Sequence, residues 1–90
     1  MGKNLIDFGK IPVRLSFEGD VVELDLRKEL GNKIHQTTGD IGFDDFARTI
    51  YFSEGEIDVP NEFIEPLKEV VKANYIAVVQ RYFNDKLINK

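Results

Sequence analysis

Residues 11–26 read IPVRLSFEGDVVELDL, and this stretch decides the fold. In its first half every second residue is apolar, namely Ile11, Val13, Leu15 and Phe17. After Gly19 the alternation resumes, with acidic residues between the apolar positions Val22, Leu24 and Leu26. A period of two is typical of a strand with one buried face, and a turn containing glycine between two such runs indicates a β-hairpin.

The loop of this hairpin is predicted from the side chains that must share a face. A loop with an even number of residues places Val13 and Leu15 opposite members of the apolar set in the second strand. Arg14 would then face Glu23 or Asp25 on the outer side, a favourable pair worth about 0.2–1 kcal/mol. A three-residue loop would instead pair apolar with polar side chains along the ladder, so we expect an even loop.

Helical spacing follows the hairpin. Leu26, Leu30 and Ile34 recur every four residues and predict a helix over residues 27–38, with Asp25 as its cap. Gly31 weakens this helix by about 1 kcal/mol relative to alanine. A second, short helix is predicted over residues 43–51, with Asp40 and Asp44 at its positive N-terminal end and Gly55 as its stop.

The last third of the chain combines a short strand pattern with a long helical one. Residues 56–59 alternate and predict a third strand that could pair with the hairpin. Pro60 suits the start of a helix, after which a broad apolar stripe continues to about Leu87. Pro66 and Asn74 interrupt that stripe, and the pattern leaves open whether residues 61–88 form one kinked helix or two.

Together these elements predict an α+β fold, in which an N-terminal β-hairpin, with or without the short strand near 56–59, packs against three or four helices. We expect residues 1–90 to form a single domain, because no linker or internal repeat divides them. Residues 1–9 are predicted to be a weak extended segment, open to being flexible, that breaks at Gly9.

The composition indicates the cellular compartment of the protein. The 90 residues contain no cysteine, which suits a reducing compartment, and 42% of them are hydrophobic. The longest purely apolar run, residues 75–79, is far shorter than the roughly 20 residues of a membrane span. The N-terminal residues lack the basic and apolar stretches of a secretory signal. We therefore expect a cytoplasmic, acidic protein that does not enter a membrane.

Few side chains here are suited to catalysis. His35 is the only histidine, and it sits at the predicted end of a helix, where a cation complements the helix dipole. The acids at positions 40, 44 and 45 do not follow the calcium-loop spacing, and no glycine-rich phosphate loop is present. We therefore predict no enzymatic activity, no cofactor and no metal site.

Charge is segregated along the chain and points to a protein partner. The net charge is −4, but residues 40–65 hold eight acidic residues against Arg48 alone, a balance of −7. We predict a non-catalytic interaction or assembly domain whose acidic residues receive a basic protein partner: Asp44, Asp45, Glu54, Glu56 and Asp58. The alternative, a nucleic-acid-binding accessory protein using Lys72, Arg81 and Lys86, is disfavoured by the acidic balance. The oligomeric state is left open.

Residues 45–60, DFARTIYFSEGEIDVP, combine a short helix, a glycine stop, a short strand and a proline start. With the preceding hairpin, this layout resembles small phage- or mobile-element-encoded proteins. The resemblance implies a role as a tail-assembly chaperone or accessory factor, that is, a phage assembly factor. It assigns no functional residue.

Overall fold

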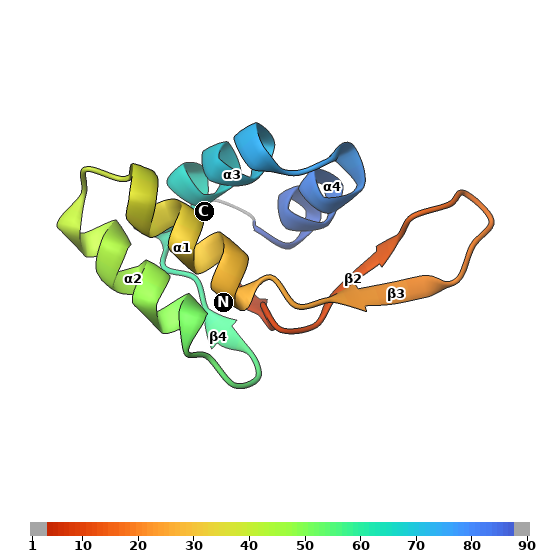
Figure 1. Ribbon diagram of the computed structural model, residues 1–90, viewed down its shortest axis with the longest axis horizontal. Coiled ribbons are helices and arrows are strands. Elements are labelled where there is room, and N and C mark those ends of the chain that lie inside the picture. The colour runs from red at the N-terminus through yellow and green to blue at the C-terminus, as the bar shows by residue number, and fades with distance from the viewer. Residues whose placement is uncertain (1–3, 88–90) are drawn as a thin grey trace.

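The computed structural model describes residues 4–87, and Figure 1 shows a helical body from which one β-hairpin projects. In chain order the elements are β1 (Leu5–Ile6), β2 (Ile11–Arg14), β3 (Val21–Leu24), α1 (Arg27–Thr37), α2 (Ile41–Tyr51), β4 (Ile57–Asp58), α3 (Asn61–Asn74) and α4 (Ala77–Lys86). The predicted α+β class is confirmed, with four helices beside the hairpin.

The hairpin consists of β2 and β3, and its loop has the predicted even parity. Val13 lies opposite Val22, as expected, and Arg14 lies opposite Val21. The predicted partner of Arg14 was wrong, because Glu23 lies opposite Pro12 and Asp25 lies beyond β3. The first strand also ends at Arg14, three residues earlier than its apolar pattern predicts, which leaves residues 15–20 as a six-residue loop.

The short strand near 56–59 is present, but its predicted pairing with the hairpin was wrong. β4 pairs antiparallel with β1, with Ile6 opposite Ile57, and forms a second two-stranded sheet. The segment expected to be flexible begins outside the described residues, and its part from residue 4 to residue 9 contains β1 and the fully buried Ile6 and Phe8. Ile6 and Phe8 belong to the main apolar cluster, so burial accounts for where this segment lies.

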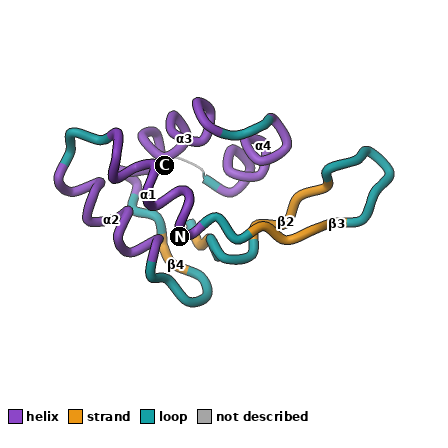
Figure 2. The backbone as a smooth tube through the Cα atoms, viewed as in Figure 1, coloured by secondary structure: helices purple, strands orange, loops and turns teal. Residues whose placement is uncertain are grey.

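Helices α1 and α2 lie side by side and form one flank of the body (Figures 1 and 2). Asp40 caps α2 by accepting a hydrogen bond from the Gly42 backbone N–H at 3.0 Å. Asp25 precedes the start of α1 by two residues and accepts the Arg27 backbone N–H, so it serves the first turn without being the N-cap residue. At Gly31 the two helices approach closely, because a Cβ built there would lie 3.0 Å from the Ala47 carbonyl oxygen.

The C-terminal segment forms two helices, which settles the question that the sequence pattern left open. α3 ends at Asn74, Tyr75 and Ile76 are extended, and α4 begins at Ala77. Pro60 is the N-cap residue of α3, one position before its first turn. Pro66 lies inside α3, where it removes the N–H that would otherwise bond the carbonyl four residues earlier.

One apolar cluster joins the hairpin base, the small sheet and all four helices. Its largest fully buried side chains include Phe8 and Phe83, whose ring centres lie 5.9 Å apart. Val13 and Leu67 are buried in it, and Leu24 and Val78 pack against it while partly exposed. The spacings of two and of about 3.6 residues therefore identified much of the core, although Leu15 and Phe17 lie outside it.

Candidate interaction surfaces

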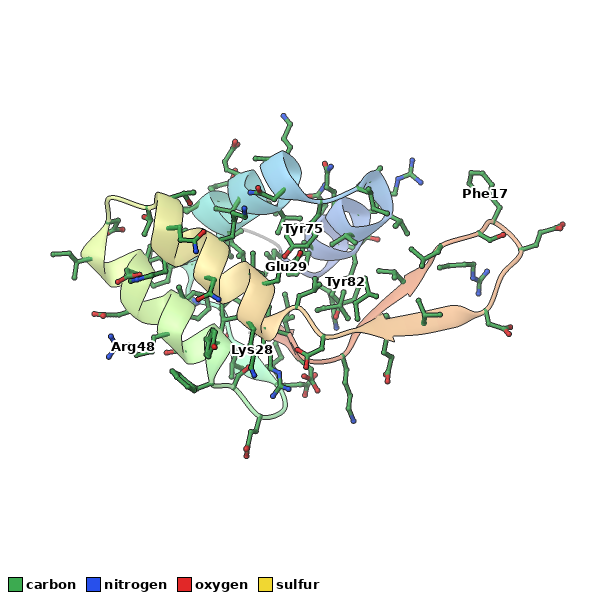
Figure 3. All side chains as sticks on the ribbon, in the orientation of Figure 1. Phe17, Lys28, Glu29, Arg48, Tyr75 and Tyr82 are labelled. Atoms are coloured by element: carbon green, nitrogen blue, oxygen red, sulfur yellow. The ribbon has the colours of Figure 1, made fainter. Side chains whose placement is uncertain are left out.

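The projecting hairpin carries apolar side chains that the fold does not cover. At its base Ile11 and Val13 are buried, whereas Leu15 is 61% exposed and Phe17 is 98% exposed in the loop. Figure 3 shows Phe17 near the far end of the hairpin, with its ring standing clear of the ribbon. Single exposed apolar residues are common on protein surfaces, whereas groups of them are typical of surfaces that contact another molecule.

A groove runs between this loop and the start of α4. Residues 14–17 line one side, and residues 76–78 with Arg81 line the other side, of an open hollow of about 720 Å³. We call it the hairpin groove. Ile76 contributes a third exposed apolar side chain, 62% accessible, from the bend between α3 and α4. Hairpin and helix are far apart in sequence, so only the folded chain creates this surface.

The charge of the hairpin groove comes from two guanidinium groups. Among the described residues, Arg14 and Arg81 are the only ionisable side chains that line it, and both are exposed. Within residues 4–87 neither forms an ion pair; the three pairs found there involve other residues. The groove is therefore apolar and cationic, and no carboxylate among residues 4–87 lines it.

A second concave surface lies over α1 and α2 and encloses about 270 Å³. Within this α1–α2 pocket the His35 Nδ1 atom lies 2.5 Å from Asp44 Oδ1. His35 is in the last turn of α1, and Asp44 is in the first turn of α2, where a carboxylate interacts favourably with the positive end of the helix dipole. Arg48 and Tyr51 complete the rim.

The chemistry available in the α1–α2 pocket is narrow. A histidine held by a carboxylate is one half of a nucleophilic relay, which also requires a hydroxyl or thiol close to the imidazole. The lining contains Tyr51 but no serine, threonine or cysteine. The His35–Asp44 contact joins two helices that already pack together, and this structural role accounts for it.

The five acidic residues predicted to form a partner site fall into two groups. Asp44 and Asp45 lie near the start of α2, while Glu54, Glu56 and Asp58 lie after its end. The part of α2 from Asp45 to Tyr51 rises about 9 Å and lies between the two groups. Asp44 contacts His35, and Asp58 accepts a hydrogen bond from the Asn4 backbone N–H at 3.2 Å. Glu54, Glu56 and Asp58 thus share one segment after α2, whereas Asp44 and Asp45 lie within the helix, nearer to its start.

Arg27 connects the base of the hairpin to the loop after α2. Its guanidinium donates to the Ser53 carbonyl at 2.8 Å and to the Asp25 carboxylate at 2.8 Å and 3.0 Å. Hydrogen bonds from Arg27 lower the pKa of Asp25 from 3.8 to about 2. The hydrogen-bonded Asp25 carboxylate raises the pKa of Arg27, and more distant carboxylates, including that of Glu54, add to this effect. Arg27 thus holds the base of the hairpin to the loop after α2 through Asp25 and Ser53.

Two tyrosines are partly buried, Tyr75 in the bend between α3 and α4 and Tyr82 on α4. Burial, and then the nearby Glu29 carboxylate, raises the pKa of Tyr75 (Figure 3). Burial is also the main reason that the pKa of Tyr82 is raised, with Glu56 contributing. Both hydroxyls thus stay neutral beside carboxylates. Tyr75 is linked through its backbone carbonyl to the Gln80 side chain, which donates a hydrogen bond at 2.8 Å.

The sequence pattern does not predict the hairpin groove, although the apolar residues Leu15 and Phe17 at the outer end of a two-stranded hairpin were a signal for it. The alternation through Leu15 and Phe17 was interpreted as a buried strand face, whereas the strand ends before both residues. A two-stranded hairpin has no second layer beyond the helical body, so its outer apolar residues have nothing of their own chain to pack against. The sequence pattern groups Arg81 with Lys72 and Lys86, whereas the structure places Arg81 beside Arg14 in the same groove.

A comparison with protein-family models, with curated proteins and with solved structures finds no match for the chain. Over residues 4–87, no helix has the length and apolarity to cross a membrane. In the same residues, no three histidine, cysteine, aspartate or glutamate side chains are placed to hold one metal ion.

Proposed function

We propose that this protein is a non-catalytic protein–protein interaction domain, acting in the cytoplasm in assembly or as an accessory subunit. The observation that carries the proposal is the 98% exposure of Phe17 on a hairpin that projects from the helical body (Figure 1). Aromatic side chains are enriched among the residues that dominate binding energy at interfaces. A phage assembly factor, as the layout of residues 45–60 suggests, would be one form of this role.

Some of the acidic residues already have partners within the chain, which favours the hairpin over the acidic residues as the main contact with another protein. Asp44 and Asp58 already have partners, and Glu54 lies in the field of Arg27. Leu15 and Phe17 have no comparable internal contact, since most of their surface faces solvent. Glu54 and Glu56 remain exposed, and we assign them a secondary contact with a basic surface of the partner.

The test is affinity purification of the full chain from its native host, comparing the wild type with Phe17→Ala and Phe52→Ala. Phe52 is a matched control, because it is 72% exposed but lies at the end of α2, away from the hairpin. We expect a co-purifying protein with the wild type and with Phe52→Ala, and its loss with Phe17→Ala.

Other outcomes separate the alternatives. Retention of the partner by Phe17→Ala, with loss on neutralising Glu54 and Glu56 to glutamine, would move the interface to the acidic loop. Recovery of nucleic acid alone, weakened by salt, would favour the nucleic-acid-binding alternative.

A further inference from the structure

We propose that the hairpin groove binds a segment of the partner protein in which apolar side chains are flanked by aspartate or glutamate. This inference rests on the proposed function and adds the chemistry of the partner. The apolar part of the groove consists of Leu15, Phe17 and Ile76, and its charged part consists of Arg14 and Arg81. The two parts together define what a complementary segment must carry.

The apolar side chains determine that the partner segment is itself apolar at its centre. Leu15 and Ile76 are each more than half exposed and come from opposite walls, so one inserted side chain can contact both. Phe17 extends beyond them from the loop and can cover the segment after it enters (Figure 3). Removing these surfaces from water is the favourable term for association.

The arginines determine the charge of the segment. A neutral or basic segment would cover Arg14 and Arg81 without giving either guanidinium a counter-ion, and a desolvated, unpaired charge opposes binding. Guanidinium groups bind carboxylates through two parallel hydrogen bonds, which also fixes orientation. Because no carboxylate from residues 4–87 lines the groove, we assign the counter-ions to the partner.

The surroundings of the groove favour a peptide over a polyanion. Glu18 and Asp20 are exposed in the same loop as Phe17, and the chain has a net charge of −4. A nucleic acid strand or an anionic membrane would bring further phosphates against these carboxylates. A peptide segment can place one carboxylate near each arginine and none near the turn.

The test uses a random dodecapeptide library displayed on phage and selected against the full, immobilised chain. We expect enriched peptides that combine apolar residues with aspartate or glutamate. A synthetic copy of the best peptide should bind the double variant Arg14→Glu/Arg81→Glu at least about tenfold more weakly than the wild type. The matched control is Lys72→Glu/Lys86→Glu, which makes the same charge change on exposed positions of α3 and α4 outside the groove lining and should leave binding unchanged.

A charge-swapped peptide provides a second measurement. Replacing its acidic residues with lysine should abolish binding to the wild type and restore binding to Arg14→Glu/Arg81→Glu. That rescue cannot arise from a misfolded variant. The inference is overturned if the selection yields no peptide, if the enriched peptides are neutral or basic, or if the Arg14→Glu/Arg81→Glu variant binds as well as the wild type.

Other occupants give different results, each of which contradicts the inference. Self-association in sedimentation experiments that is lost in Arg14→Glu/Arg81→Glu would identify a second copy of the chain as the occupant. Groove-dependent binding of a DNA oligonucleotide, or of vesicles containing anionic lipid, would identify phosphate as the ligand. Loss of the native partner on Phe17→Ala, combined with failure of the peptide tests, would retain the proposed function and reject only the acidic segment.

Discussion

Replacing Gly31 with alanine sets two physical effects against each other. In a helix interior alanine is more favourable than glycine by about 1 kcal/mol, so helix propensity alone predicts that the variant is more stable. The tertiary structure predicts the reverse. A Cβ at position 31 would lie 3.0 Å from the Ala47 carbonyl oxygen and 3.1 Å from the Tyr51 Cβ. Both contacts belong to α2, and one of them is to its backbone, which cannot rotate away.

The size of the effect follows from these contacts. Adding a methyl group where the helices already touch forces α1 and α2 apart, and overpacking of this kind costs about 1–3 kcal/mol. Subtracting the gain in helix propensity leaves a net loss of about 0–2 kcal/mol, centred near 1. For a domain of this size, a loss of about 1 kcal/mol lowers the melting temperature by about 4–8 °C.

The assay is chemical and thermal unfolding of the full chain followed by circular dichroism. Gly39→Ala is the control, because no atom lies within 4 Å of the Cβ position there. It should be neutral or slightly stabilising, since alanine restricts the unfolded chain. If Gly31→Ala proves more stable than the wild type, close helix contact does not explain the glycine, and the reasoning fails.

Three further predictions follow from burial and charge. Phe83→Ala should lower the free energy of unfolding by about 3–5 kcal/mol, because the ring is fully buried. Phe17→Ala should leave the free energy of unfolding nearly unchanged, because the ring is exposed. Equal losses for the two variants in denaturant titrations would contradict the assignment of Phe83 to the core. The lowered pKa of Asp25 contributes stability that is present above the ordinary pKa of 3.8 and is lost as the pH falls through the folded-state pKa of about 2. Asp25→Asn should therefore reduce the dependence of the unfolding free energy on pH in the acid range. An unchanged dependence would contradict the interaction with Arg27. The raised pKa of Tyr75 means that the folded state favours the neutral hydroxyl, so stability is full below about pH 10 and is lost as the pH rises above it. Tyr75→Phe should therefore unfold at a higher pH than the wild type. An identical midpoint of alkaline unfolding would argue against burial of the hydroxyl.

Several features of the fold could be predicted because they depend on local patterns. The even hairpin loop followed from which side chains must meet, and Val13 does lie opposite Val22. The helices followed from apolar spacing and caps, and Asp40 caps α2. The break at Asn74 was visible as an interruption, but whether two helices would result depended on packing beyond the local pattern.

The interaction surfaces were harder to predict because they join distant parts of the chain. The acidic residues were grouped by their nearness in sequence, whereas α2 separates Asp44 and Asp45 from the rest. The hairpin groove combines Arg14 with Arg81, and no spacing rule connects two residues so far apart. The pairing of β4 with β1 instead of the hairpin was missed for the same reason, because two-residue strands carry almost no information about their partners.

The amino-acid sequence by itself determined which segments become strand or helix and which of their faces are apolar, because those properties depend on residues two to four positions apart. Only the tertiary structure decided which apolar residues would be left in solvent, where α1 and α2 would touch at Gly31, and which charges would remain without partners. Each of these outcomes depends on which elements pack against one another, and a projecting hairpin has an exposed tip only because the helical body ends before reaching it.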